Sequence, residues 1–134
     1  MARILLIDDD AALRSAVRRA LERAGYEVRE AGDGESGLRV HREVGADLVI
    51  VDIFMPERDG LELIRELRTA APGVKILAMS GGGKSGKIDL LKDATVFGAA
   101  RTLRKPFEMS ELWNAVRELL PDHPTAAVRP PTAP

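Results

Sequence analysis

Short apolar runs alternate with amphipathic segments along most of this chain, and this alternation restricts the fold more than any other feature. Four apolar runs recur, at residues 4–7, 48–51, 74–79 (broken only by Lys75) and, less regularly, 99–103. Runs of this length between turn signals are typical of buried strands. Residues 26–31 (YEVREA) add a strand with alternating polarity.

The segments between these runs have apolar residues three and four positions apart, which is the spacing of one helix face. Two of them are well defined, one containing Leu13, Val17, Ala20, Leu21 and Ala24 and the other Leu61, Leu63, Ile64 and Leu67. Weaker helical patterns cover residues 36–44, 88–97 and 110–120, and the last begins near Glu108 or Ser110. Trp113 belongs to the apolar face of that last helix, which we expect to pack in the core.

The predicted order is therefore strand then helix, five times over. The strands are expected near residues 3–7, 26–31, 47–52, 74–79 and 100–103. Strands that alternate with helices pair in parallel through right-handed crossovers. The sequence thus predicts an α/β fold, doubly wound, with helices on both faces of one sheet.

The composition changes after Leu120. Prolines at positions 121, 124, 130, 131 and 134 lie among Ala, Thr and Arg, a composition that neither continues a helix nor builds a core. We expect one folded domain over residues 1–120 and a disordered tail over residues 121–134, with no output domain after it.

The charge and residue content exclude several classes of protein. Lys and Arg number 20 against 21 Asp and Glu, so a net charge of −1 disfavours binding to nucleic acid or to an anionic membrane. There is no cysteine for a disulfide or a thiolate metal site. No stretch is long and apolar enough for a signal peptide or a membrane span. We expect a cytoplasmic protein.

Polar side chains gather where the predicted strands end. Asp8, Asp9 and Asp10 follow the first strand, and Asp52 ends the third. Ser80 and Lys105 follow the fourth and fifth strands. Ligands of open parallel sheets bind beyond these carboxyl ends. A cluster of carboxylates there would repel itself unless a cation such as Mg²⁺ were bound.

This set of groups suits a phosphoryl group carried on an aspartate. A metal and Lys105 would neutralise the phosphoryl oxygens, Ser80 would donate a hydrogen bond, and one carboxylate would act as nucleophile. Each residue alone is weak support, since an Asp after a strand is more often a turn former or a helix cap. Asp10, just before the first helix, is predicted to be such a cap.

The segments ILLIDDD, LVIVDIFMPERDG, ILAMSG and RKPF, in this order, resemble the response regulator receiver family over residues 3 to about 120. The resemblance, which includes the single-domain chemotaxis type, implies a flavodoxin-like (βα)5 sheet of strand order 2-1-3-4-5. It also implies a cis peptide bond between Lys105 and Pro106 and a turn at Pro56 and Gly60 after the phosphorylation site.

The same resemblance assigns roles to individual residues. Asp52 is implied to be the phosphoacceptor, with Ser80 and Lys105 contacting the phosphate. The metal ligands are implied to be Asp8, Asp9, Asp52 and the backbone carbonyl of Phe54, with Mg²⁺ as the ion.

Two departures from the family pattern concern signalling. The stretch from Ser80 to Lys105 is a few residues longer than is usual and contains four glycines between positions 81 and 86, which predicts a long mobile loop. Thr102 stands at the switch position, where the family usually has an aromatic residue. We therefore expect the coupling from Ser80 to the surface to be weaker or to involve the glycine-rich loop.

Two glycine motifs suggest other functions. Residues 32–37 fit G-x-G-x-x-G, but a dinucleotide site needs a larger unit, and these glycines are more simply the turn into the second helix. Residues 81–87 fit G-x-x-x-x-G-K, yet Ile88 replaces the Ser or Thr of an ATP-binding loop. His41 and His123 have no partner at ligand spacing and are expected to be solvated.

The resulting hypothesis is a stand-alone response regulator that takes a phosphoryl group on Asp52 from a histidine kinase or a phosphotransfer protein. The altered surface would then change its binding to a downstream protein target, and autodephosphorylation would be its only chemistry. The alternative is a receiver-like scaffold or adaptor that works without phosphorylation. The complete set of phosphorylation residues favours the first hypothesis.

Overall fold

A computed structural model of the chain describes residues 2–55, 58–80, 94–95 and 98–121. The predicted helix at residues 88–97 and the predicted tail fall almost entirely outside these ranges, so both remain predictions. The elements in chain order are β1 (Arg3–Ile7), α1 (Ala11–Arg23), β2 (Glu27–Ala31), α2 (Gly34–Val44), β3 (Leu48–Asp52), β4 (Phe54–Met55), β5 (Arg58–Asp59), α3 (Gly60–Ala70), β6 (Lys75–Ser80), β7 (Arg101–Arg104) and α5 (Met109–Leu119).

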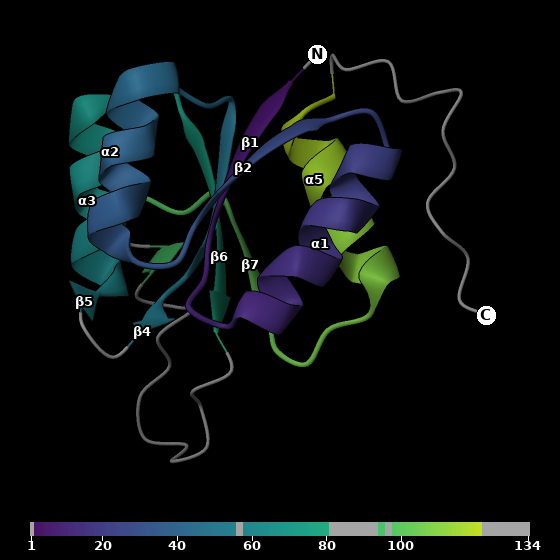
Figure 1. Ribbon diagram of the computed structural model, residues 1–134. Coiled ribbons are helices and arrows are strands. Elements are labelled where there is room, and N and C mark those ends of the chain that lie inside the picture. Colours follow the sequence, from purple (N-terminus) through teal and green to yellow (C-terminus); the bar gives the residue numbers. More distant parts are fainter. Residues whose placement is uncertain (1, 56–57, 81–93, 96–97, 122–134) are drawn as a thin grey trace.

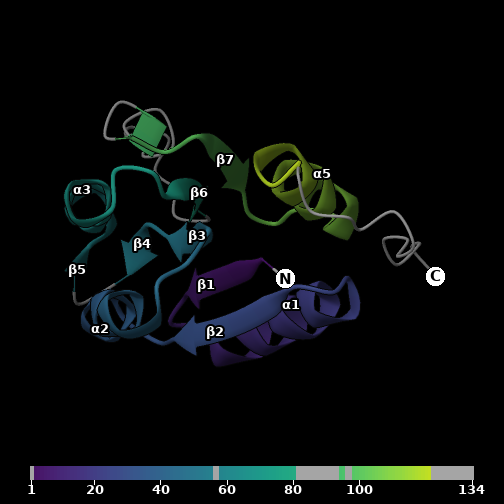
Figure 2. The ribbon, with the colours of Figure 1, turned by 90° about the horizontal axis from the view of Figure 1, so that it is seen from above.

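Five of the strands form one parallel sheet in the order β2-β1-β3-β6-β7. Since β6 and β7 are the fourth and fifth predicted strands, this is the predicted order 2-1-3-4-5. Helices α2 and α3 cover one face of the sheet and α1 and α5 the other (Figure 1). The view from above shows the sheet running between these two layers (Figure 2).

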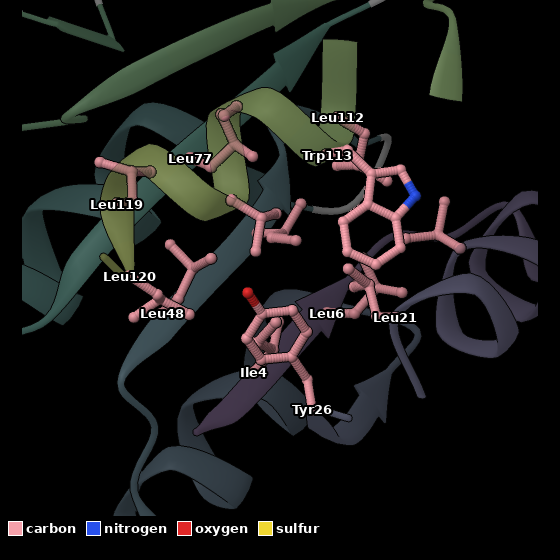
Figure 3. Close-up of a cluster of buried hydrophobic side chains, with 14 of the residues drawn as sticks. Ile4, Leu6, Leu21, Tyr26, Leu48, Leu77, Leu112, Trp113, Leu119 and Leu120 are labelled. Carbon is pink, nitrogen blue, oxygen red and sulfur yellow. The ribbon is translucent and has the colours of Figure 1, made fainter. Parts of the chain in front are cut away.

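Successive side chains of the central strands point to opposite faces, and both faces are buried. Alternate residues of β1 and β3, such as Ile4, Leu6, Leu48 and Ile50, pack with α1 and α5 in one cluster. Trp113 of α5 belongs to this cluster, as predicted, and lies near Leu21 of α1 (Figure 3). The intervening residues of the same strands pack with α2 and α3 in a second cluster that contains Leu63, Ile64 and Leu67.

Side-chain caps begin the helices that follow the strands. The Asp10 carboxylate accepts a hydrogen bond from the Leu13 amide at 3.0 Å, so Asp10 is the N-cap of α1, as predicted. Asp33 accepts from the Ser36 amide at 2.7 Å at the start of α2, which confirms that residues 32–34 form a turn into that helix. Glu108 and Glu111 form a capping box at the start of α5.

Two features differ from the sequence analysis. An antiparallel hairpin, β4 with β5, stands between β3 and α3 where only a turn was expected. His41 is half-buried rather than solvated, because it lines a groove between α2 and α3.

None of the described helices is both long enough and apolar enough to cross a membrane.

Candidate functional site

The carboxyl ends of three strands bring Asp8, Asp52 and Lys105 together. Asp52 is the last residue of β3, and Asp8 and Lys105 directly follow β1 and β7. Strand β3 pairs with β1 on one side and with β6 on the other, and β6 pairs with β7. Parallel pairing therefore sets these strand ends along one edge of the sheet, as the sequence predicts.

The Lys105 amine bridges two buried carboxylates. Its Nζ lies 3.0 Å from Asp8 Oδ2 and 3.0 Å from Asp52 Oδ2. Burial lowers the pKa of the Lys105 amine, but the hydrogen bonds to Asp52 and Asp8 raise this pKa by more, so the net shift is upward from its ordinary value. The amine is therefore positively charged at neutral pH.

Asp8, Asp9 and Asp52 form an acidic cluster in which one carboxylate oxygen of each residue lies within 4.8 Å of those of the other two. Asp8 and Asp52 are buried, and Asp9 is exposed. Three carboxylates and the Lys105 amine give a formal charge of −3 + 1 = −2. A divalent cation would neutralise that charge, and an all-oxygen donor set suits Mg²⁺.

Asp10, the third aspartate after β1, is part of the cap of α1. The Asp10 carboxylate is used by the cap of α1, while its backbone N–H donates to Asp8 Oδ1 at 2.9 Å. The structure thus separates Asp8 and Asp9 from Asp10, as the sequence analysis expected.

Ser80 and Phe54 are the other two residues that the resemblance assigns to the site. Ser80 is the buried last residue of β6, and its carbonyl accepts from the Lys105 backbone N–H at 2.9 Å. Phe54 begins β4, two residues after Asp52, and its backbone pairs with Asp59. The Lys105–Pro106 peptide bond is cis, as the resemblance implied. The roles assigned to Ser80 and Phe54 remain predictions.

Comparison with known proteins decides the family. A family model described as the response regulator receiver domain matches residues 4–117. The chain belongs to this family. It is thus a receiver domain of the two-component signalling type, a signalling protein rather than a classical enzyme.

Among its relatives, the response regulator receiver protein CpdR of Brucella abortus (strain 2308) is 36% identical over 120 residues, which cover 90% of this chain and 98% of CpdR. The sensor kinase CckA of the same strain is 38% identical over 121 residues, or 89% of this chain and 12% of CckA. The receiver domain spans 12% to 50% of the first curated relatives that it matches.

The solved structures agree with this assignment. The chemotaxis protein CheY4 of Vibrio cholerae superposes with a TM-score of 0.78 at 29% identity and covers 89% of this chain and 98% of its own. Receiver domains generally bind Mg²⁺ at an acidic pocket, and Asp8, Asp9 and Asp52 form an acidic cluster in this chain.

Thr102 lies in the edge strand β7 of this receiver domain. It pairs with Ala78 of β6 and is half-buried. The glycine-rich loop at residues 81–86 lies outside the described residues, so the expected link between the two remains a prediction.

Sequence reasoning missed one residue at the site. Arg14, in the second turn of α1, donates from Nη1 to the Asp8 carbonyl at 2.6 Å and from Nε to Glu30 Oε1 at 2.9 Å. The sequence did contain one indication that Arg14 lies near the site. Arg14 is four positions after the predicted cap Asp10, so it lies one helical turn from the acidic segment. An arginine on an amphipathic helix is usually solvated, which hid its role.

Proposed function

We propose that this receiver domain accepts a phosphoryl group on Asp52 in a Mg²⁺-dependent reaction and changes its binding to a downstream protein partner as a result. The observation that supports this most is the Lys105 amine, held 3.0 Å from both Asp8 and Asp52 beside the exposed Asp9. A purely structural ion pair would not need a third carboxylate at that place.

Asp8, Asp9, Asp52 and the Phe54 carbonyl would hold the ion. When bound, Mg²⁺ neutralises charge on the phosphoryl oxygens and on the carboxylates around them. The fit rests on the oxygen-only donor set and on the residual charge of the cluster.

The Asp52 carboxylate is the nucleophile. One of its oxygens forms a bond to phosphorus as the bond between phosphorus and the donor's histidine nitrogen breaks, and the released imidazole leaves with the electron pair of that bond. The product on this chain is an acyl phosphate. Water later attacks the phosphorus, which releases inorganic phosphate and restores the Asp52 carboxylate.

Lys105 and Ser80 would stabilise the transferring group. The Lys105 amine already contacts the attacking carboxylate, so a small shift lets it donate to a phosphoryl oxygen where negative charge accumulates. The Ser80 hydroxyl, at the end of the neighbouring strand, would donate to another of these oxygens.

The proposed donor is a sensor histidine kinase or a histidine phosphotransfer protein, since histidine kinases phosphorylate receiver domains. We propose a cytoplasmic protein that binds neither nucleic acid nor membrane, in line with its net charge of −1. The downstream partner would bind the surface that changes on phosphorylation.

A phosphotransfer profile tests the proposal. The purified chain is mixed with a panel of autophosphorylated histidine kinases and Mg²⁺, and loss of label from each kinase is followed over time. We expect rapid transfer from a small subset of kinases and none to an Asp52→Ala variant. If the chain takes label from none of the kinases and is not phosphorylated by acetyl phosphate either, a scaffold that works without phosphorylation is favoured instead.

A further inference from the structure

Asp9 is the member of the acidic cluster whose position is least explained by its own contacts. Its side chain is exposed, and within residues 2–55, 58–80, 94–95 and 98–121 no hydrogen bond or ion pair holds its carboxylate. By contrast, Asp8 and Asp52 are buried and share the Lys105 amine. The direction of the Asp9 side chain therefore depends on the backbone that carries it.

That backbone is fixed by Arg14. The Asp8 carbonyl, the Asp9 nitrogen and the Asp9 Cα lie in one peptide plane, because the peptide bond is planar. Arg14 Nη1 donates to this carbonyl oxygen at 2.6 Å. A bond to the carbonyl restricts rotation of the whole plane, and so restricts where the Asp9 Cα and side chain lie.

Arg14 is itself anchored from a second strand. Its Nε donates to Glu30 Oε1 at 2.9 Å, and its guanidinium lies against Gly32, where a Cβ would come 3.4 Å from Nη1. The Arg14 and Glu30 side chains are only 20% and 24% exposed, so solvent screens this pair weakly. Glu30 also pairs with Arg18, which contacts the other carboxylate oxygen, Oε2.

We propose that Arg14 is a positioning residue for the metal site, which sets the Asp8–Asp9 peptide so that the Asp9 carboxylate meets the ion with Asp8 and Asp52. The inference rests on the proposed Mg²⁺ site. Arg14 contacts none of the three carboxylates in the cluster and acts only through the carbonyl of Asp8.

The geometry requires arginine rather than another cation. Nε and Nη1 are neighbouring donors of one planar group, and they reach Glu30 and the Asp8 carbonyl at the same time. A lysine amine at this position keeps the charge but lacks the rigid fork, so Arg14→Lys should restore only part of the function.

Arg18 supplies a matched control. It lies one turn further along α1 and pairs with the same Glu30, but among the described residues its side chain pairs with Glu30 and Glu22 and not with the acidic segment. Arg14→Gln and Arg18→Gln therefore remove the same charge and weaken the same carboxylate pairing. Only the first loses the bond to the Asp8 carbonyl.

The test measures binding of Mg²⁺ alone to the full chain by calorimetry, with no phosphoryl donor. We expect Arg14→Gln to weaken Mg²⁺ binding by about tenfold, the lower end for groups that orient metal ligands. Arg14→Lys should lie between this variant and the original protein, and Arg18→Gln should change the dissociation constant by less than about twofold. Equal affinity for Arg14→Gln and the original protein would overturn the inference.

A second measurement does not depend on the metal. In metal-free protein, the amide ¹⁵N resonance of Asp9 should shift in Arg14→Gln and stay in place in Arg18→Gln, since Asp9 N shares the peptide with the Asp8 carbonyl. An unmoved Asp9 resonance in Arg14→Gln would refute the inference. If Arg14→Gln does not fold, Arg14→Lys and Glu30→Gln replace it with the same expected directions.

The two proposals fail differently. If the original protein binds no Mg²⁺, the proposed function fails, and the metal role of Arg14 fails with it. If the original protein binds Mg²⁺ and all the variants bind equally well, only the inference on Arg14 is wrong.

Discussion

The Lys105 amine lies 3.0 Å from the Asp52 carboxylate, although the two residues are 53 positions apart in the chain. The same amine contacts Asp8 at 3.0 Å, so one cation holds together two buried acids from neighbouring strands. The protein thus offsets part of the repulsion in its acidic cluster with a residue that directly follows the edge strand β7.

Replacing Lys105 should destabilise the metal-free protein. In Lys105→Met, two buried carboxylates face each other without a cation. We expect a loss of about 3 kcal/mol of unfolding free energy, the lower end for a broken buried ion pair, because the Lys105 side chain is 18% exposed. Urea denaturation in EDTA measures this loss. Mg²⁺ should restore more stability to the variant than to the original protein. An unchanged unfolding free energy would mean that the bridge contributes nothing.

Asp9 and Asp10 are adjacent acids with different expected roles. Asp9→Asn should weaken Mg²⁺ binding by at least about tenfold, because it removes a proposed metal ligand. Asp10→Asn should change the affinity little, since Asn caps a helix about as well as Asp. Calorimetric titration of the two variants provides the comparison, and similar losses in both would refute this division of roles.

The acidic cluster can be predicted from the sequence because its position follows from the geometry of a parallel sheet. Each of the four polar residues Asp8, Asp52, Ser80 and Lys105 ends or directly follows a recognisable strand, and the ends of parallel strands share one edge. This pattern predicts the fold class and the meeting of Asp8, Asp52 and Lys105, whereas the strand order is implied by the resemblance to the receiver family.

Features that depend on how two elements meet could not be predicted in this way. The half-burial of His41 depends on the placement of α3 beside α2, and the Arg14 contact depends on the turn that carries the Asp8 carbonyl. Helical periodicity shows which face of a helix is apolar. It does not show which backbone atom lies opposite a polar side chain.

The close approach of Gly60 to Ile53 is another contact between two elements that the sequence does not reveal, and it leads to a prediction. A Cβ on Gly60 would lie 2.3 Å from Ile53 Cα, which is backbone next to Asp52. Gly60→Ala should therefore cost about 2 kcal/mol of unfolding free energy, as overpacking usually does. Gly73→Ala, where a Cβ would meet nothing within 4 Å, should change it by less than about 0.5 kcal/mol. Equal effects in chemical denaturation would show that the Gly60 contact relaxes freely.

His41 should make stability depend on pH. Burial lowers the pKa of His41 from its ordinary 6.5, so the unfolded chain binds a proton at a higher pH than the folded chain does. The unfolding free energy should therefore be fully retained above about pH 6.5 and should decline as the pH falls from there through the lowered pKa. His41→Asn removes this decline. Denaturation of both proteins between about pH 5 and 8 tests it, and parallel profiles would contradict the assignment to His41.

Intact-mass measurement after treatment with acetyl phosphate and Mg²⁺ tests the central proposal, that Asp52 is the phosphoacceptor, most directly. The original protein should gain the mass of one phosphoryl group, EDTA should prevent the gain, and Asp52→Ala should gain none. Asp10→Asn, which keeps the cluster of Asp8, Asp9 and Asp52, serves as the control and should be modified like the original protein. An Asp52→Ala protein that gains the phosphoryl mass to the same extent would contradict the account.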